Sequence, residues 1–96
     1  MKIFFSKRAE EKYASTLDYL RENFGETATA VFKQKAADFI ELLSGFPEMG
    51  VIEVETKKIR SFLLTKQTRV FYCIKKDKII ILTFFNTYQS PKKRPK

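Results

Sequence analysis

The fold of this chain is decided by Lys78-Ile79-Ile80-Ile81-Leu82-Thr83-Phe84-Phe85-Asn86-Thr87-Tyr88-Gln89-Ser90-Pro91. Residues 79–85 are apolar apart from Thr83 and rich in β-branched and aromatic types, which predicts a strand covered on both faces and therefore central in a sheet. The run is too short to span a membrane as a helix. Polar residues follow it, and Pro91 cannot continue a strand ladder. We therefore expect a buried strand that presents polar side chains at its exposed end.

The composition is that of one folded domain. The chain has 96 residues, of which 44% are hydrophobic and 31% charged, and this predicts a globule with a single modest core. We place the domain at residues 1–91 and expect residues 92–96 to form a flexible basic tail. The lone Cys73 excludes a disulfide within the chain, and the N-terminus lacks the apolar core of a signal peptide. A cytoplasmic protein is expected.

The net charge of +8 is distributed unevenly along the chain. Residues 1–56 hold seven Lys/Arg and ten Asp/Glu, whereas residues 57–96 hold twelve Lys/Arg and only Asp77. A cationic half joined to a mildly acidic half favours a surface for a polyanion. Many small proteins carry a solvated basic surface, and an acidic protein partner would suit the same surface as nucleic acid.

Two amphipathic helices are predicted between residues 7 and 45. Ser6 suits an N-cap, and Gly25 is the expected end of the first helix. Thr27 is a candidate N-cap for the second helix, which ends at Gly45. The short link predicts an antiparallel helical hairpin. Its apolar stripes are Ala9, Tyr13, Leu17, Leu20 and Phe24, then Phe32, Ala36, Phe39, Ile40 and Leu43.

Strand-like runs complete the chain. Ile3–Phe5 precedes the helices, residues 51–56 alternate apolar and acidic types, and residues 58–65 and 69–75 lead to the run at 79–85. Short links make neighbouring strands antiparallel. The predicted fold class is α+β: an N-terminal strand, then an antiparallel helical hairpin packed on an antiparallel β-meander, in the order β-α-α-β-β-β. The other sheet face is expected to be partly open, with alternation leaving four cations free to face solvent or a ligand: Lys58, Arg60, Lys66 and Arg69.

Several kinds of site are excluded by residue type. The chain has no histidine and one cysteine, so it cannot build a His-dependent nucleophile or a cysteine zinc site. Its three glycines make neither a P-loop nor a dinucleotide fingerprint. No metal and no cofactor are predicted. The remaining set is cationic and phenolic, with Glu53 and Glu55 nearby in sequence: Lys57, Lys58, Arg60, Lys66, Arg69 and Tyr88.

This set suits phosphate binding and, by extension, RNA cleavage. Arginine forks and lysine point charges hold phosphate oxygens. Attack by a 2′-hydroxyl needs a base, cations that stabilise the charged phosphorane, and an acid for the leaving oxygen. A lysine crowded by other cations can act as the base. Taken singly, each of these residues is better explained as a solubilising surface charge, and only the cluster supports a site.

Taken together, these features resemble those of the RelE/ParE family. Its members are the toxins of type II toxin–antitoxin systems and are also called plasmid stabilization proteins. The resemblance rests on the order of the elements, on the loop Phe46-Pro47-Glu48-Met49-Gly50, on the basic strand Lys58-Ile59-Arg60, and on the closing block that ends in Gln89-Ser90-Pro91. It implies an acidic, DNA-binding antitoxin as partner and a hetero-oligomer with it. Some members cleave mRNA on the ribosome, and others inhibit DNA gyrase without nuclease activity.

Carried over by position, the resemblance assigns catalytic roles to Lys58, Arg60, Arg69 and Tyr88. It leaves RNA-binding roles to Lys57, Lys66, Asn86, Lys92 and Lys93. Asn86 stands where a histidine is common and Tyr88 where an arginine is common. The prediction is a toxin that acts as a metal-independent mRNA endoribonuclease, slightly ahead of gyrase inhibition. An inactive toxin and a non-toxic nucleic-acid or protein-binding module are also compatible with these residues.

Overall fold

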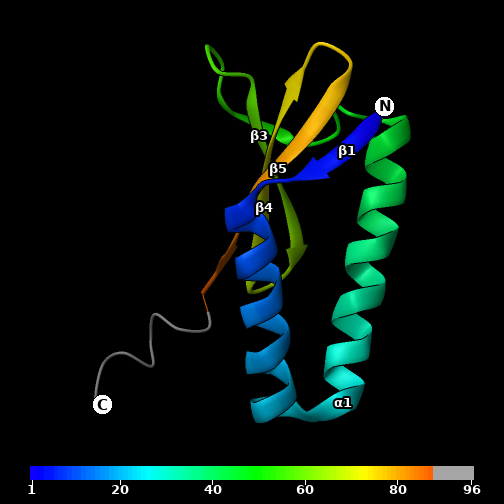
Figure 1. The fold of residues 1–96 in the computed structure, drawn as a ribbon, viewed down its shortest axis with the longest axis vertical. Coiled ribbons are helices and arrows are strands. Elements are labelled where there is room, and N and C mark those ends of the chain that lie inside the picture. Colours follow the sequence, from blue (N-terminus) through cyan, green and yellow to red (C-terminus); the bar gives the residue numbers. More distant parts are fainter. Residues whose placement is uncertain (88–96) are drawn as a thin grey trace.

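The computed structural model describes residues 1–87, and its elements are joined by short turns (Figure 1). Residues 88–96, which include the predicted basic tail, lie outside the described part. No helix among the described residues is long and apolar enough to cross a membrane. The elements are β1 (Lys2–Phe5), α1 (Lys7–Gly45), β2 (Val51–Val54), β3 (Ile59–Thr65), β4 (Thr68–Lys75) and β5 (Lys78–Asn86).

The strands form one five-stranded sheet in the order β1-β5-β4-β3-β2. β2 to β5 pair antiparallel, as the short turns predict. β2 is one edge strand of the sheet and β1 is the other. β1 pairs with β5 in parallel, with Ile3 opposite Ile79. The hairpin of helices separates β1 from the meander in sequence, and such a long connection permits parallel pairing. The predicted α+β class is confirmed.

Element α1 consists of two helical arms that lie side by side and antiparallel (Figure 1). They meet at Gly25, which has φ 91° and ψ −179°. A positive φ is costly for residues with a Cβ, so glycine is suited to this break. At the start of α1 the Ser6 hydroxyl accepts a 3.0 Å hydrogen bond from the Ala9 amide and donates to the Leu82 carbonyl at 2.8 Å. The predicted N-cap therefore also ties the first arm to β5.

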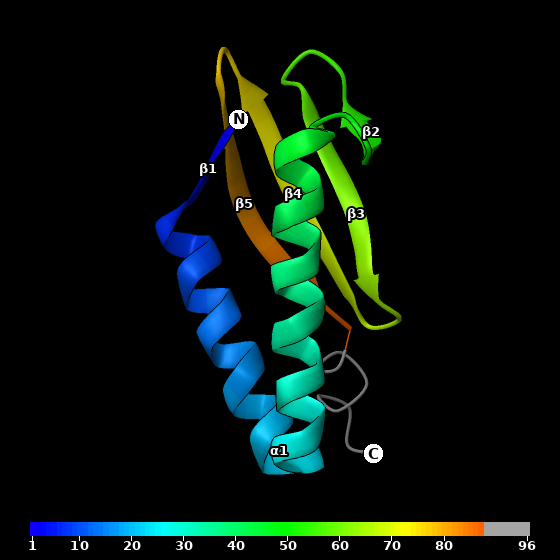
Figure 2. The ribbon, with the colours of Figure 1, turned by 90° about the vertical axis from the view of Figure 1, so that its right-hand side faces the viewer.

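The core lies between the hairpin and one face of the sheet, which we call the inner face (Figure 2). Phe39 of α1 stacks on Phe62 of β3 with ring centroids 4.8 Å apart. The ring centroids of Tyr13 and Phe84 of β5 lie 5.5 Å apart. Aromatic pairs of this kind add to the free energy gained from burying their apolar area. No helix of residues 1–87 packs on the opposite face, which we call the outer face (Figure 2).

Residues 79–85 do form a strand inside the sheet, since β5 lies between β1 and β4, but the prediction that both of its faces are covered is wrong. The middle strand is β4. β5 buries Ile79, Ile81 and Phe84 on the inner face, but Phe85 is 54% exposed. A register shift opposite Phe71 and Tyr72 places one extra residue in β5 between the buried positions 81 and 84, and such a bulge changes which residues share a face. Residues 79–85, apart from Thr83, are thus continuously apolar because apolar side chains also occupy the outer, uncovered face of β5.

Candidate functional site

The structure divides the predicted site residues between the two ends of the sheet. Lys57 and Lys58 precede β3 at the end where the chain also turns from β4 into β5. Arg69 lies towards the opposite end, where it pairs with Leu63. From residue 58 to residue 63 an extended strand rises roughly 17 Å. The backbones of Lys58 and Arg69 therefore lie far apart along the sheet, although the Arg69 guanidinium reaches back to Ser61.

Arg60 is held by a loop, whereas strand alternation predicted that it would be free. It pairs with the buried Tyr72 on the inner face. Its Nη1 atom donates hydrogen bonds to the Glu48 carbonyl at 3.0 Å and to the Gly50 carbonyl at 2.7 Å. These charge-assisted bonds fix the loop between α1 and β2. The catalytic role assigned to Arg60 by resemblance stays a prediction.

Tyr72 completes the anchoring of this loop. Its hydroxyl donates to the Pro47 carbonyl at 2.8 Å and accepts from the Gly50 amide at 2.9 Å. Burial raises the pKa of Tyr72, so its proton stays in place to make this bond at neutral pH. A Cβ on Gly50 would lie 2.7 Å from both the Ser61 carbonyl oxygen and the Tyr72 hydroxyl oxygen. Close packing against β3 and β4 therefore explains the glycine at position 50 of this loop.

Arg69 takes part in a hydrogen-bonded network that sequence reasoning did not find. Its Nη1 atom donates to the hydroxyl of the buried Ser61 at 2.8 Å. The same hydroxyl donates to Glu53 Oε2 at 2.5 Å. Arg60 and Phe62 face inward, and neighbouring residues of a strand face opposite sides of a sheet. This alternation could have predicted from the sequence that Ser61 lies on the outer face. The network holds a guanidinium and a carboxylate near one another on that face.

Asn86 connects the sheet to the first arm of α1. Its Oδ1 accepts a 2.6 Å hydrogen bond from the Thr68 hydroxyl, and its Nδ2 donates to the Thr16 hydroxyl at 2.6 Å. Both threonines are buried. The amide is thus engaged on the inner face, and its predicted role in RNA binding is untested. Lys66 is exposed in the turn between β3 and β4. Tyr88, Lys92 and Lys93 lie outside the described residues.

Apolar side chains surround Arg69 on the outer face. Arg69 is paired with Leu63 on one side and with Phe85 on the other. Leu63 is 52% exposed and Phe85 54% exposed. Exposed apolar groups that lie together on an open sheet face mark a surface for a binding partner. The term outer patch is used below for Leu63, Arg69 and Phe85.

Comparison with known protein families identifies the chain. Residues 3–91 match the family described as the ParE toxin of the type II toxin–antitoxin system, parDE. The chain belongs to the ParE toxin family. It is therefore a toxin of a type II toxin–antitoxin system. A comparison with curated protein sequences found no match.

Solved structures share the fold of this toxin. The chromosomal ParDE toxin–antitoxin system from P. aeruginosa superposes with a TM-score of 0.73 at 16% identity, over 90% of this chain and 95% of that one. The YoeB/ParE toxin from Agrobacterium tumefaciens gives 0.64 at 15% identity, over 92% and 100%. The YoeB–YefM complex from Staphylococcus aureus gives 0.61 at 17% identity, over 92% and 98%. At these identities the likeness extends to the fold alone.

Proposed function

We propose that this toxin arrests growth by binding and inhibiting DNA gyrase, and that it does not cut RNA. One observation carries the proposal: both arginines that would surround a scissile phosphate are held by hydrogen bonds within the chain. Lys58 is at one end of β3 and Arg69 is towards the other. Arg60 points to the inner face and binds loop carbonyls. A binding surface remains, and it is centred on the outer patch.

The requirements of phosphoryl transfer explain why these hydrogen bonds weigh against cleavage. A general base must be within hydrogen-bond reach of the proton that it removes. Groups that stabilise the charged phosphorane must lie about 3 Å from its oxygens. The Arg60 Nη1 atom is already engaged by two loop carbonyls, and the Arg69 Nη1 atom by the Ser61 hydroxyl. Sequence reasoning put mRNA cleavage slightly ahead of gyrase inhibition, and the arrangement of the described side chains favours the reverse order.

Cleavage of mRNA is the second candidate, and a different observation favours it. The Arg69–Ser61–Glu53 network brings a carboxylate and a guanidinium to one hydroxyl. Glu53 would be the base and Arg69 the phosphate-binding cation in such a site. This version of the mechanism needs neither Lys58 nor Arg60.

Two assays on the same protein separate the candidates. Purified toxin is added to a gyrase supercoiling reaction, and mRNA from cells expressing the toxin is mapped by primer extension. We expect inhibited supercoiling and no new mRNA ends. Undiminished supercoiling together with new ends that vanish in Glu53→Gln would overturn the proposal in favour of cleavage. Arg69→Gln should weaken gyrase inhibition, whereas Arg21→Gln, on the exposed surface of α1, serves as the charge-matched control.

We also propose a cytoplasmic, acidic antitoxin as the partner that neutralises the toxin. The S. aureus YoeB–YefM structure is a toxin–antitoxin complex. An apolar hollow of about 560 Å³ lies beside the end of α1, and it would accept an apolar segment of the antitoxin. Its lining includes Met1, Leu42, Phe46, Met49 and Ile74.

The test uses two residues of the same helical arm with matched exposure. Leu42 lines the hollow, and both Leu42 and Val31 are 49% exposed. We expect Leu42→Ser to reduce co-purification with the acidic protein encoded beside the toxin, and Val31→Ser to leave it unchanged. Equal loss in both variants, or in neither, would argue against the hollow as the docking site.

A further inference from the structure

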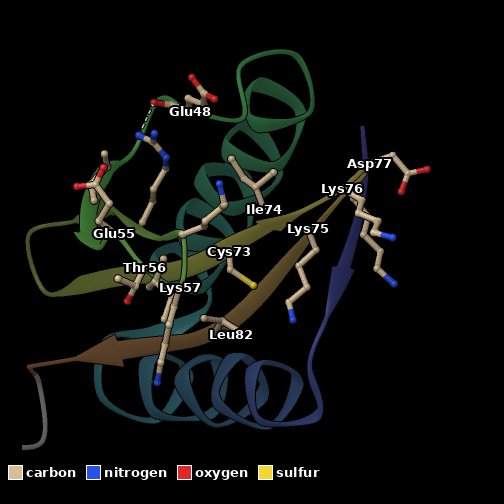
Figure 3. Close-up of a pocket in the computed structure, with 15 residues that line it drawn as sticks. Glu48, Glu55, Thr56, Lys57, Cys73, Ile74, Lys75, Lys76, Asp77 and Leu82 are labelled. Atoms are coloured by element: carbon tan, nitrogen blue, oxygen red, sulfur yellow. Dashed lines mark hydrogen bonds between the residues drawn. The ribbon is translucent and has the colours of Figure 1, made fainter.

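A group of lysines surrounds a hollow at the end of the sheet opposite the outer patch. The hollow has a volume of about 1070 Å³ and lies between the turn that precedes β3 and the β4–β5 turn. In Figure 3, Lys57 and Lys75 lie on either side of Cys73 and Leu82. We call this region the lysine end. Arg60, which is held by loop carbonyls, also lines it. Its lysines are Lys57, Lys58, Lys75, Lys76 and Lys78.

The charge of the lysine end is not neutralised within the described part of the chain. Three carboxylates also line the hollow, those of Glu48, Glu55 and Asp77. Over residues 1–87 the ion pairs closer than 4.0 Å involve only Arg21 with Asp18 and Glu26. All five lysines are exposed. Exposed ammonium groups around a hollow produce a local positive potential that attracts anions.

Two of these lysines adopt an unfavourable backbone conformation. Lys58 has φ 56° and Lys76 has φ 49°, and among residues 1–87 no other residue with a side chain has a positive φ. Lys76 occupies the first position of the two-residue loop that joins the paired Lys75 and Lys78. Glycine is the residue usually found at such positions, because it carries no Cβ. Backbone strain of this kind is concentrated at functional sites.

We infer that the lysine end binds the phosphodiester backbone of a nucleic acid. Five cations that extend from two adjacent turns suit a chain of regularly spaced phosphates better than a single small anion. Lysine ammonium groups act as point charges without fixed direction, which favours contact with backbone rather than with base edges. The site is separate from the outer patch and is not required for inhibition of gyrase through protein contacts. It therefore goes beyond the proposed function.

Binding to labelled oligonucleotides tests the inference directly. The full chain is titrated into a fluorescent duplex DNA and, in parallel, into single-stranded RNA, at salt concentrations from about 50 to 200 mM. We expect the triple variant Lys57→Gln/Lys75→Gln/Lys76→Gln to bind about tenfold more weakly. Its plot of log affinity against log salt should be less steep by about 2 for RNA and about 3 for DNA.

The matched control removes three lysines from α1, in Lys7→Gln/Lys33→Gln/Lys35→Gln. All three are exposed, and the change in net charge is the same. We expect the control to bind within about twofold of the unmodified chain. The nucleic acid that binds more tightly, DNA or RNA, is the one whose phosphodiester backbone the lysine end recognises. Failure to bind either one, or equal losses in the two triple variants, overturns the inference.

A second variant separates a binding role from a turn role. Lys76→Gly removes both the charge and the steric cost of the positive φ, whereas Lys76→Gln removes only the charge. We expect Lys76→Gly to raise Tm by about 4 °C and to lower nucleic-acid affinity as much as Lys76→Gln does. Unchanged affinity in both variants would show that Lys76 is only a turn residue and would contradict the inference.

Discussion

The two faces of the sheet use similar side chains in opposite ways. On the inner face Arg60, Tyr72 and Asn86 each form two hydrogen bonds to groups in neighbouring segments. On the outer face Leu63 and Phe85 stay more than half exposed on either side of Arg69. Such hydrogen bonds stabilise the fold, most of all where the partners are buried, as Thr16 and Thr68 are beside Asn86. On the outer face, the exposed side chains of Leu63 and Phe85 are available to bind another molecule.

This contrast explains how the toxin can carry a large cationic surface and still fold. Every buried side-chain nitrogen or oxygen within the described residues has a hydrogen-bond partner. The lysines of the lysine end, which have no carboxylate partner among residues 1–87, are exposed, so that water solvates their charge. Substitutions on the inner face should therefore change stability, and those on the outer face should change binding.

The largest effect is expected for Gly50→Ala. The added Cβ would lie 2.7 Å from the Ser61 carbonyl oxygen and the Tyr72 hydroxyl oxygen, so the loop must shift. Overpacking of this kind should cost about 3 kcal/mol in the free energy of unfolding, measured by urea denaturation. Gly45→Ala is the control, because a Cβ there meets nothing within 4 Å. Equal losses at both positions would contradict the packing argument.

Asn86→Ala should lower the free energy of unfolding by about 2 kcal/mol. It removes the acceptor of the buried Thr68 hydroxyl and the donor to Thr16. Thermal and urea denaturation measure the loss. Asn23→Ala is the matched control, since Asn23 is exposed and bonds only within its own helical arm, to the Tyr19 carbonyl at 2.9 Å. If Asn86→Ala proved as stable as the control but bound RNA more weakly, the role predicted from sequence would be the correct one.

Tyr72→Phe should destabilise the fold by about 1.5 kcal/mol, because the Gly50 amide loses its acceptor. It should also change the response to alkaline pH. Burial raises the pKa of Tyr72 in the folded state above its ordinary value of 10.0. The associated stability is complete below pH 10 and is lost as pH rises through the folded-state pKa.

The phenylalanine variant should therefore lose less stability than the unmodified chain above pH 10. The comparison is made by urea denaturation at a series of pH values. The pKa of Tyr13 is also raised by burial. Both proteins should therefore still lose some stability at alkaline pH because of Tyr13. Identical pH dependence in the two would show that the Tyr72 proton does not contribute.

The smallest effect on stability is expected on the outer face. Leu63→Thr and Phe85→Thr replace side chains that are more than half exposed, and each should change the free energy of unfolding by less than about 0.5 kcal/mol. Both should reduce the inhibition of gyrase supercoiling. A loss of stability comparable to that of Asn86→Ala would remove the distinction between the two faces.

Much of the fold was predictable because its signals are local. The Ser6 cap, the break at Gly25 and the apolar stripe through Ala9 and Leu20 each depend on residues within a few positions of one another. The antiparallel meander followed from its short turns. The parallel pairing of β1 was not predicted, because the partner strand lies more than seventy residues away and no sequence period reports it.

The candidate site was much less predictable. Residue type indicated that Arg60 and Arg69 were available for phosphate binding, but it carries no information on which face each would occupy. Pairing with Tyr72 puts Arg60 on the inner face, where the loop at 46–50 supplies carbonyl acceptors. Glu53 and Ser61 gained their contact with Arg69 only through the pairing of β2, β3 and β4.

The sequence by itself determined the helical hairpin, the meander and the excess of positive charge in residues 57–96, because period, capping and composition act along the chain. Only the tertiary structure decided where those charges lie. Strand register sent Lys57 and Lys58 to one end and Arg69 towards the other. The bulge in β5 put Ile81 and Phe84 on the same face, which left Phe85 on the exposed one. Register depends on contacts between strands, and it is therefore invisible until the sheet has formed.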